Sequence, residues 1–201
     1  MSTMDQQTYA TVTDVCARLT GRLADDTVRS VREDYFGGES LQAETTLLMS
    51  LAYERVGITP EEHALIRSTL DDPDNPDLAA VTIIPEVPAV PYHFSPIAGP
   101  HAPSPTAADA LLMEEASRHH GRRLRRTWRT PLDGAPDNTP TWVYVLQIAP
   151  PGNELRAFSA MASRLWVTLH EKWPVEAVTE GRLLPPYQAA ALTAAHQLWS
   201  S

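Results

Sequence analysis

At 201 residues, with an apolar share of 43% and 18 prolines, the chain is long enough to fold as one domain or as a large domain with a small attached one. Its net charge of −9 marks it as acidic, and no run approaches the roughly 18 apolar residues of a membrane span. The first ten residues lack the apolar core of a secretory signal, and a single cysteine, Cys16, excludes a disulfide framework. We therefore expect a cytoplasmic protein with no membrane association.

The charge is divided unevenly along the chain. Residues 1–80 hold fifteen acidic residues against six basic ones, whereas residues 122–201 hold six acidic residues against nine basic ones. Such asymmetry indicates either a polar partner or docking of one half of the chain on the other. Fifteen of the sixteen basic residues are arginine, which together with abundant alanine and proline is typical of a GC-rich bacterial genome.

The N-terminal region has the periodicity of helices. Apolar residues at steps of three and four predict a helix over about 6–24. Asp25 and Asp26 are candidate caps of a second, shorter helix. Gly37 and Gly38 would end that helix, because glycine readily takes the left-handed conformation at a helix C-terminus.

Two further helices are predicted before residue 72. The first, over about 40–56, has a wide apolar surface and Gly57 as its expected C-terminal stop. The second begins with the strongest local signal in the chain, a capping box. Thr59 takes the N-cap, Pro60 follows it, and Glu62 stands at the third helical position.

Residues 73–105 form a proline-rich segment. Pro85, Pro88 and Pro91 are three residues apart, which is the period of a polyproline II helix. A strand is expected just before them, at 80–84. The segment is predicted to be extended, lying over the domain or linking two parts of it.

The next region alternates between helix and strand signals. A helix is predicted over about 106–119, with Gly121 closing it. Two strands should follow, at 122–130 and 141–149, separated by a turn-rich stretch. The second strand is almost continuously apolar, which predicts a central position with both faces covered.

The C-terminal elements predict a crossover. A helix over about 153–172 is followed by a short strand at 174–179, and these lengths suit a strand parallel to 141–149. A last helix is predicted to begin after Pro186 and to continue to about Trp199. The fold class is therefore α+β, with a helical N-terminal half, a proline-rich crossing segment and a small mixed sheet with helices.

Three regions follow from this pattern: a helical region (1–72), the proline-rich extended segment (73–105) and an α/β region (106–201). We expect them to pack as one domain.

A cluster of arginines stands on the strand at 122–130. Alternation puts Leu124 and Trp128 on one face of that strand, and Arg123, Arg125, Thr127 and Arg129 on the other. The arginine face would meet solvent, the acidic half of the chain, or an anionic ligand or partner. Nucleic acid is disfavoured, because the chain as a whole is acidic and carries no recognised nucleic-acid signature.

Histidines lie close to the same region. His119 and His120 are adjacent, so on a helix they point about 100° apart and cannot easily share one metal ion. They suit the negative end of the preceding helix. His93 and His101 lie in the proline-rich segment, but no ligand spacing supports a metal site. We assign no metal and no cofactor.

No convincing catalytic arrangement is present, and no catalytic residue is assigned. This favours a non-enzymatic protein-interaction protein, such as an inhibitor, immunity-type or adaptor protein, that acts by charge complementarity on a protein partner or as a homo-oligomer. The candidate binding residues are Arg123, Arg125, Arg126, Arg129, Trp128, His93 and His120.

The alternative is a small-ligand-binding protein or an enzyme. Its pocket would lie between the helical half and the sheet and would combine aromatic, imidazole and guanidinium groups. The residues expected there are Tyr92, His93, Arg126, Trp128 and His120.

Overall fold

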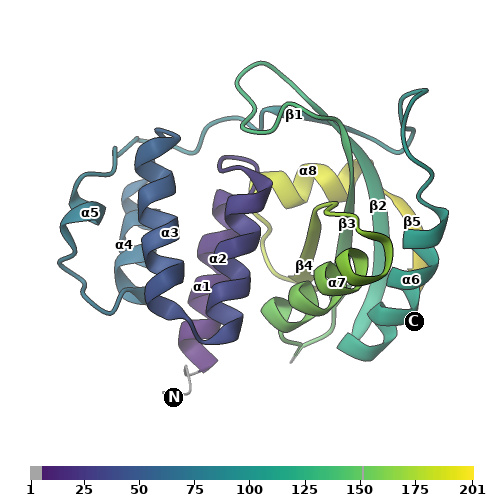
Figure 1. The fold of residues 1–201 in the computed structure, drawn as a ribbon, viewed down its shortest axis with the longest axis horizontal. Helices are drawn as coiled ribbons and strands as arrows, with labels where there is room; N and C mark the ends of the chain where they lie inside the picture. The colour runs from purple at the N-terminus through teal and green to yellow at the C-terminus, as the bar shows by residue number, and fades with distance from the viewer. Residues whose placement is uncertain (1–5, 151) are drawn as a thin grey trace. The chain divides into compact units, whose positions relative to one another are not determined.

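The computed structural model describes residues 6–150 and 152–201. The prediction about a secretory signal rests partly on residues 1–5, which lie outside the described residues. The chain divides into two units (Figure 1). Unit 1 comprises the residues up to 91 together with 134–137, and unit 2 comprises 92–133 and 138–201. Unit 1 is helical and unit 2 is built on a mixed sheet, which confirms the predicted α+β class.

Unit 1 contains the four predicted helices and one short addition. Their apolar stripes meet in a core that includes Val12, Leu19, Val31, Leu47 and Ile66. The added helix is a single turn, begun by a side-chain cap from Asn75 and by Pro76. The helices are α1 (Gln6–Leu19), α2 (Asp25–Gly37), α3 (Ser40–Tyr53), α4 (Pro60–Thr69) and α5 (Pro76–Ala79).

Helix α2 begins differently from the prediction. Ala24 takes the N-cap position, so the expectation that Asp25 or Asp26 caps the helix is wrong. A carboxylate distant in the sequence does that work instead, since Asp137 accepts the N–H of Asp25 at 3.0 Å. The two aspartates lie in the first turn, where their charge favours the positive end of the helix. The predicted end is confirmed, with Gly38 in the left-handed conformation (φ 84°).

Helix α3 ends earlier than its apolar pattern suggests. Arg55, with φ 56°, takes the left-handed position after the helix, so the prediction that Gly57 does so is wrong. Gly57 is instead required for close packing, because a Cβ there would lie 2.5 Å from a methyl carbon of Ile84. The neighbouring Ile58 forms an isolated bridge with Ile83, and this bridge is all that forms of the strand predicted at 80–84.

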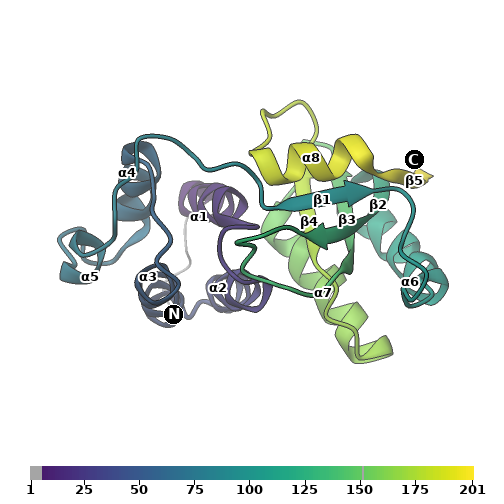
Figure 2. The same ribbon diagram turned by 90° about the horizontal axis from the view of Figure 1, so that it is seen from above.

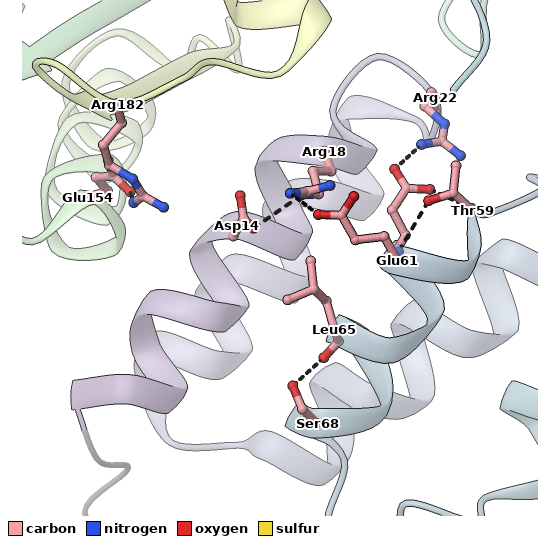
Figure 3. Close-up of polar contacts among 10 residues, drawn as sticks. Asp14, Arg18, Arg22, Thr59, Glu61, Leu65, Ser68, Glu154 and Arg182 are labelled. Carbon is pink, nitrogen blue, oxygen red and sulfur yellow. Dashed lines mark hydrogen bonds and ion pairs between the residues drawn. The ribbon is translucent and has the colours of Figure 1, made fainter. Parts of the chain in front are cut away.

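The capping box of α4 is confirmed and has an additional partner. The Thr59 hydroxyl accepts the N–H of Glu62 at 3.2 Å, and the Glu62 carboxylate accepts the N–H of Thr59 at 2.8 Å. Arg22, which follows α1, forms an ion pair with the same carboxylate (Figure 3). Its guanidinium also donates to the Gly57 carbonyl. This ion pair connects the N-terminus of α4 to the residues that follow α1.

Unit 2 contains five strands in one sheet. Four of them lie in the order β1-β2-β3-β4, and β5 also pairs with β2. Strands β3 and β4 are parallel, as predicted, and the buried pattern of β3 agrees with its predicted central position. The strands are β1 (Tyr92–Ser95), β2 (Gly121–Pro131), β3 (Thr141–Ile148), β4 (Val175–Thr179) and β5 (His196–Ser200).

Helices cover both faces of the sheet. Helices α6 (Thr106–Ala116) and α7 (Glu154–Leu169) pack on one face, and α8 (Pro186–Ala194) packs on the other (Figure 2). Among the described residues, no helix combines the length and the hydropathy needed to cross a lipid bilayer.

Two predicted helix ends in unit 2 are wrong. The helix expected to reach Trp199 ends at Ala194, because the following residues pair as β5 with residues 123–126 of β2. After α6 and a short 3-10 turn, the left-handed residue is His120 (φ 56°) and not Gly121. Gly121 begins β2, where a Cβ would lie 2.5 Å from the Ala116 carbonyl oxygen.

The ion pair between Arg22 and Glu62 predicts that two adjacent glutamates, Glu61 and Glu62, contribute very differently to the stability of the protein. Glu62→Ala should destabilise the protein by about 3 kcal/mol, because it leaves the buried Arg22 guanidinium without its counterion and removes half of the capping box. Glu61→Ala should cost less than about 0.5 kcal/mol, because Glu61 is exposed. Urea unfolding followed by far-UV circular dichroism compares the two variants, and equal losses would contradict this account.

Candidate functional site

The arginine cluster lies on the longest strand of the sheet, β2, and the predicted alternation is confirmed. Leu124 and Trp128 stand opposite Leu146 and Trp142 of β3, on the face that α6 and α7 cover. The alternate residues of β2, which include Arg125 and Arg129, face α8. The arginines therefore divide between the two faces of the sheet.

Arg129 lies in the core beneath α8. It is 1% exposed, and its guanidinium lies 4.3 Å from the centre of the Tyr92 ring. It also donates a hydrogen bond of 3.0 Å to the Tyr187 hydroxyl of α8. The Tyr187 ring meets the edge of Phe94 at 5.2 Å between centroids. Such an aromatic enclosure compensates a buried guanidinium through cation–π attraction and hydrogen bonding.

Arg126 belongs to a second cluster on the opposite face. It forms an ion pair with Asp109 of α6, and its guanidinium lies 4.4 Å from the Trp142 ring centre. The Tyr144 hydroxyl donates to the other oxygen of Asp109 at 2.8 Å. Burial, and then the negative charge of Asp109, raise the pKa of that hydroxyl, so Tyr144 remains a donor. Trp128 packs edge-on against Trp142 at 4.9 Å between centroids.

The remaining two candidate arginines also have partners within unit 2. Arg125 donates to the Leu192 carbonyl of α8 at 3.4 Å. Arg123 is half exposed and lies 3.6 Å from Glu180, a weak surface pair. Each of the four candidate arginines therefore has an interaction inside its own unit.

The candidate histidines are not brought together. His93 pairs with Thr130 at one end of β2, whereas His120 directly precedes Gly121 at the other end. An eleven-residue strand separates them by roughly 30 Å. The Nε2 atom of His119 lies 3.0 Å from the Glu115 carboxylate. No group of three or more histidine, cysteine, aspartate or glutamate side chains in the described part of the chain could hold a metal ion.

The residues of the alternative pocket are distributed over both faces of the sheet. Tyr92 lies with Arg129 on the α8 face. Arg126 and Trp128 lie on the α6 face. The geometry therefore gives this combination no common site within unit 2.

The two units differ strongly in charge. Unit 1 holds 17 aspartates and glutamates against 6 arginines, a net charge of −11. Unit 2 holds 8 acidic residues against 10 basic ones, a net charge of +2. Unit 1 therefore carries all of the net negative charge of the chain.

The basic residues of unit 1 are mostly engaged by its own acids. Arg18 contacts Asp14 at 3.1 Å and Glu61 at 2.9 Å (Figure 3). Arg67 contacts Asp74 at 2.7 Å. With Arg22 held by Glu62, these pairs leave a large excess of acidic side chains. The exposed ones include Glu39, Asp71, Asp72 and Asp77.

Electrostatic crowding is visible where α2 meets α3. Partial burial, and then the charge of Glu39, raise the pKa of Asp34. Glu44 is buried on α3, and this burial raises the pKa of its carboxyl group. Glu44 accepts the backbone N–H of Asp71 with both oxygens, at 3.1 and 3.3 Å. The acidic residues thus border α3 from more than one direction.

Helix α3 exposes apolar residues that the sequence assigned to no site. Leu41 is 69% exposed, Met49 62% and Tyr53 89%. The apolar pattern of residues 40–56 predicts only a wide apolar surface, without showing which part of that surface is exposed. The signal was present nevertheless, because apolar residues occur around most of the helix circumference, which one buried face cannot accommodate.

Comparisons with protein-family models, with curated proteins and with solved structures found no match. The function is therefore inferred from the residues of this chain.

Because Arg129 is buried and Arg123 is half exposed, we expect their substitution to affect stability very differently. Arg129→Ala should destabilise unit 2 by about 3 kcal/mol, because it empties a buried position and removes a hydrogen bond to Tyr187. Arg123→Ala should cost less than about 0.5 kcal/mol. All five tryptophans lie in unit 2, so tryptophan fluorescence during urea unfolding measures both effects. Similar stability of the two variants would refute a core role for Arg129.

The raised pKa of Glu44 predicts a pH-dependent effect of Glu44→Gln. Ionisation of Glu44 is harder in the folded protein, so its contribution to stability is complete below its unfolded pKa and is lost as pH rises through the folded pKa. The neutral variant should therefore melt at a higher temperature than the parent protein at pH 7, and the difference should vanish below about pH 4. Melting temperatures are measured by calorimetry over this pH range. Glu86→Gln, an exposed control with the same change in charge, should change the melting temperature less than Glu44→Gln does.

Proposed function

We propose that this chain is a non-enzymatic protein-interaction protein of the bacterial cytoplasm, of the inhibitor, immunity-type or adaptor kind. Its acidic helical unit binds a partner protein that presents a basic surface. The observation that carries the proposal is the net charge of −11 on unit 1, beside +2 on unit 2. A field of one sign on one unit accelerates encounter with an oppositely charged partner and disfavours partners of like charge.

The engagement of the arginines supports this assignment. Arg125, Arg126 and Arg129 have partners inside unit 2 and are at least partly buried. Their use by an external anionic partner would require those contacts to break. We therefore assign partner binding to the acidic unit 1 and not to the arginine cluster. The arginines instead hold α6 and α8 on the sheet.

The proposal is tested by capture from native lysate of the source organism, using the full chain on a support. One variant carries Asp71→Asn and Asp72→Asn in the acidic turn after α4, and Asp77→Asn in the first turn of α5. A control variant changes unit 2 instead, with Arg123→Ala. We expect the parent protein and the control to retain the same identified basic protein at low salt.

Salt and charge decide the outcome of that experiment. Binding of the purified partner, measured by calorimetry, should weaken steeply between low and physiological ionic strength, because the interaction is electrostatic. The triple Asn variant should bind about tenfold more weakly. Failure to capture any protein, or unchanged binding by the triple variant, would count against the proposal.

A further inference from the structure

The exposed face of α3 carries no charged side chain. Leu41, Thr45, Met49 and Tyr53 are spaced four residues apart and all are exposed. The single charged residue of the helix, Glu44, is buried on the other side. An uncharged face along a whole helix is unusual on a unit with a net charge of −11.

The polar groups on this face are satisfied within the helix. The Thr45 hydroxyl donates to the Leu41 carbonyl at 2.8 Å, which leaves its methyl group for contact with a neighbour. The Gln42 amide lies 3.4 Å from the Thr46 hydroxyl. Covering the face would therefore bury apolar surface without stranding a hydrogen-bonding group of Thr45.

Acidic residues border the face. Glu39 stands at the N-cap of α3 and is exposed, two residues before Leu41, the first residue of the face. The exposed Asp71 donates its backbone N–H to Glu44 on the buried side of α3, so the acidic residues 71–77 lie next to this helix. Helix α5, which contains Asp77, also contacts α3. On the other side α3 packs against α2, which carries Glu33.

We propose that this α3 face, defined by Leu41, Thr45, Met49 and Tyr53, is the docking surface for a basic amphipathic helix of a partner protein. The inference rests on the function proposed above and specifies its contact surface. An apolar strip with acidic borders is complementary to a helix that has an apolar stripe between lysines or arginines.

The dimensions of the face suit a helix. From Leu41 to Tyr53 the strip spans about 18 Å, which is the length of a partner helix of three to four turns. Residues four apart form a ridge that packs into the grooves of a second helix. Burial of the exposed leucine, methionine and tyrosine side chains supplies the affinity, and the acidic borders favour a basic partner.

The negative charge of unit 1 disfavours two other possible occupants of the α3 face. A second copy of the chain would bring two units of net charge −11 together at their acidic borders. An anionic membrane surface would repel the same borders. A basic protein helix is the occupant that satisfies both the apolar strip and its surroundings.

The experiment uses the full chain and a fluorescein-labelled synthetic helix of about 18 residues, with leucines along one face and lysines beside them. A second peptide replaces every lysine with glutamate. Fluorescence anisotropy should show binding of the lysine peptide and at least tenfold weaker binding of the glutamate peptide. The variant with Leu41→Gln, Met49→Gln and Tyr53→Gln should bind the lysine peptide at least tenfold more weakly than the parent protein.

The glutamine variant should remain folded, because the three residues are exposed and glutamine is a good helix former. Unchanged far-UV circular dichroism and melting temperature verify this. The matched control carries Ile97→Gln and Leu183→Gln, two exposed apolar residues of unit 2, and should bind like the parent protein.

Each contrary result overturns a different part of the inference. Equal binding of both peptides would exclude charge selection, and full binding by the glutamine variant would exclude the α3 face. Dimerisation of the parent protein in sedimentation, abolished by the glutamine changes, would assign the face to a second copy. If the glutamine variant still binds the partner captured from lysate with full affinity, the proposed function survives while this surface is refuted.

Discussion

The burial of guanidinium groups constrains the architecture of unit 2 more than any other feature. A charged group removed from water is tolerated only where counterions, hydrogen-bond acceptors or aromatic rings compensate the lost hydration. Arg129 finds this compensation in Tyr92 and Tyr187, and Arg126 finds it in Asp109 and Trp142. The first set joins β1 and α8 to the sheet and the second joins α6 to its other face. The arginines of one strand thus help to position elements on both sides.

This requirement determines where charge remains available for a partner. In unit 2, Arg125, Arg126 and Arg129 of β2 have partners within the unit, and the net charge of the unit is only +2. In unit 1 the Arg22–Glu62 and Arg18–Asp14 pairs consume only part of a large excess of acid. The charge asymmetry of the sequence is therefore expressed as one strongly acidic unit and one nearly balanced unit.

Features encoded locally were predictable, and features that depend on distant partners were not. The capping box at Thr59 and the buried run of β3 involve neighbouring residues or composition, and both are as predicted. The last strand was missed because residues 196–200 become extended only by pairing with β2. Alternation along β2 showed which arginines share a face, but no local pattern indicates that α8 covers Arg129. The α3 face was missed because periodicity identifies an apolar surface without showing which part of it is buried.

The packing of α3 also bears on how a partner would bind. Its buried side, with Ala43, Leu47 and Leu51, holds the helix against α2, so the exposed side is formed before any partner arrives. A preformed surface avoids the entropy cost of ordering a segment on binding. Attraction by the acidic borders would then affect mainly the rate of association, whereas burial of the apolar strip would determine how long the complex lasts. Charge and apolar area on this unit would therefore contribute to different stages of the proposed binding event.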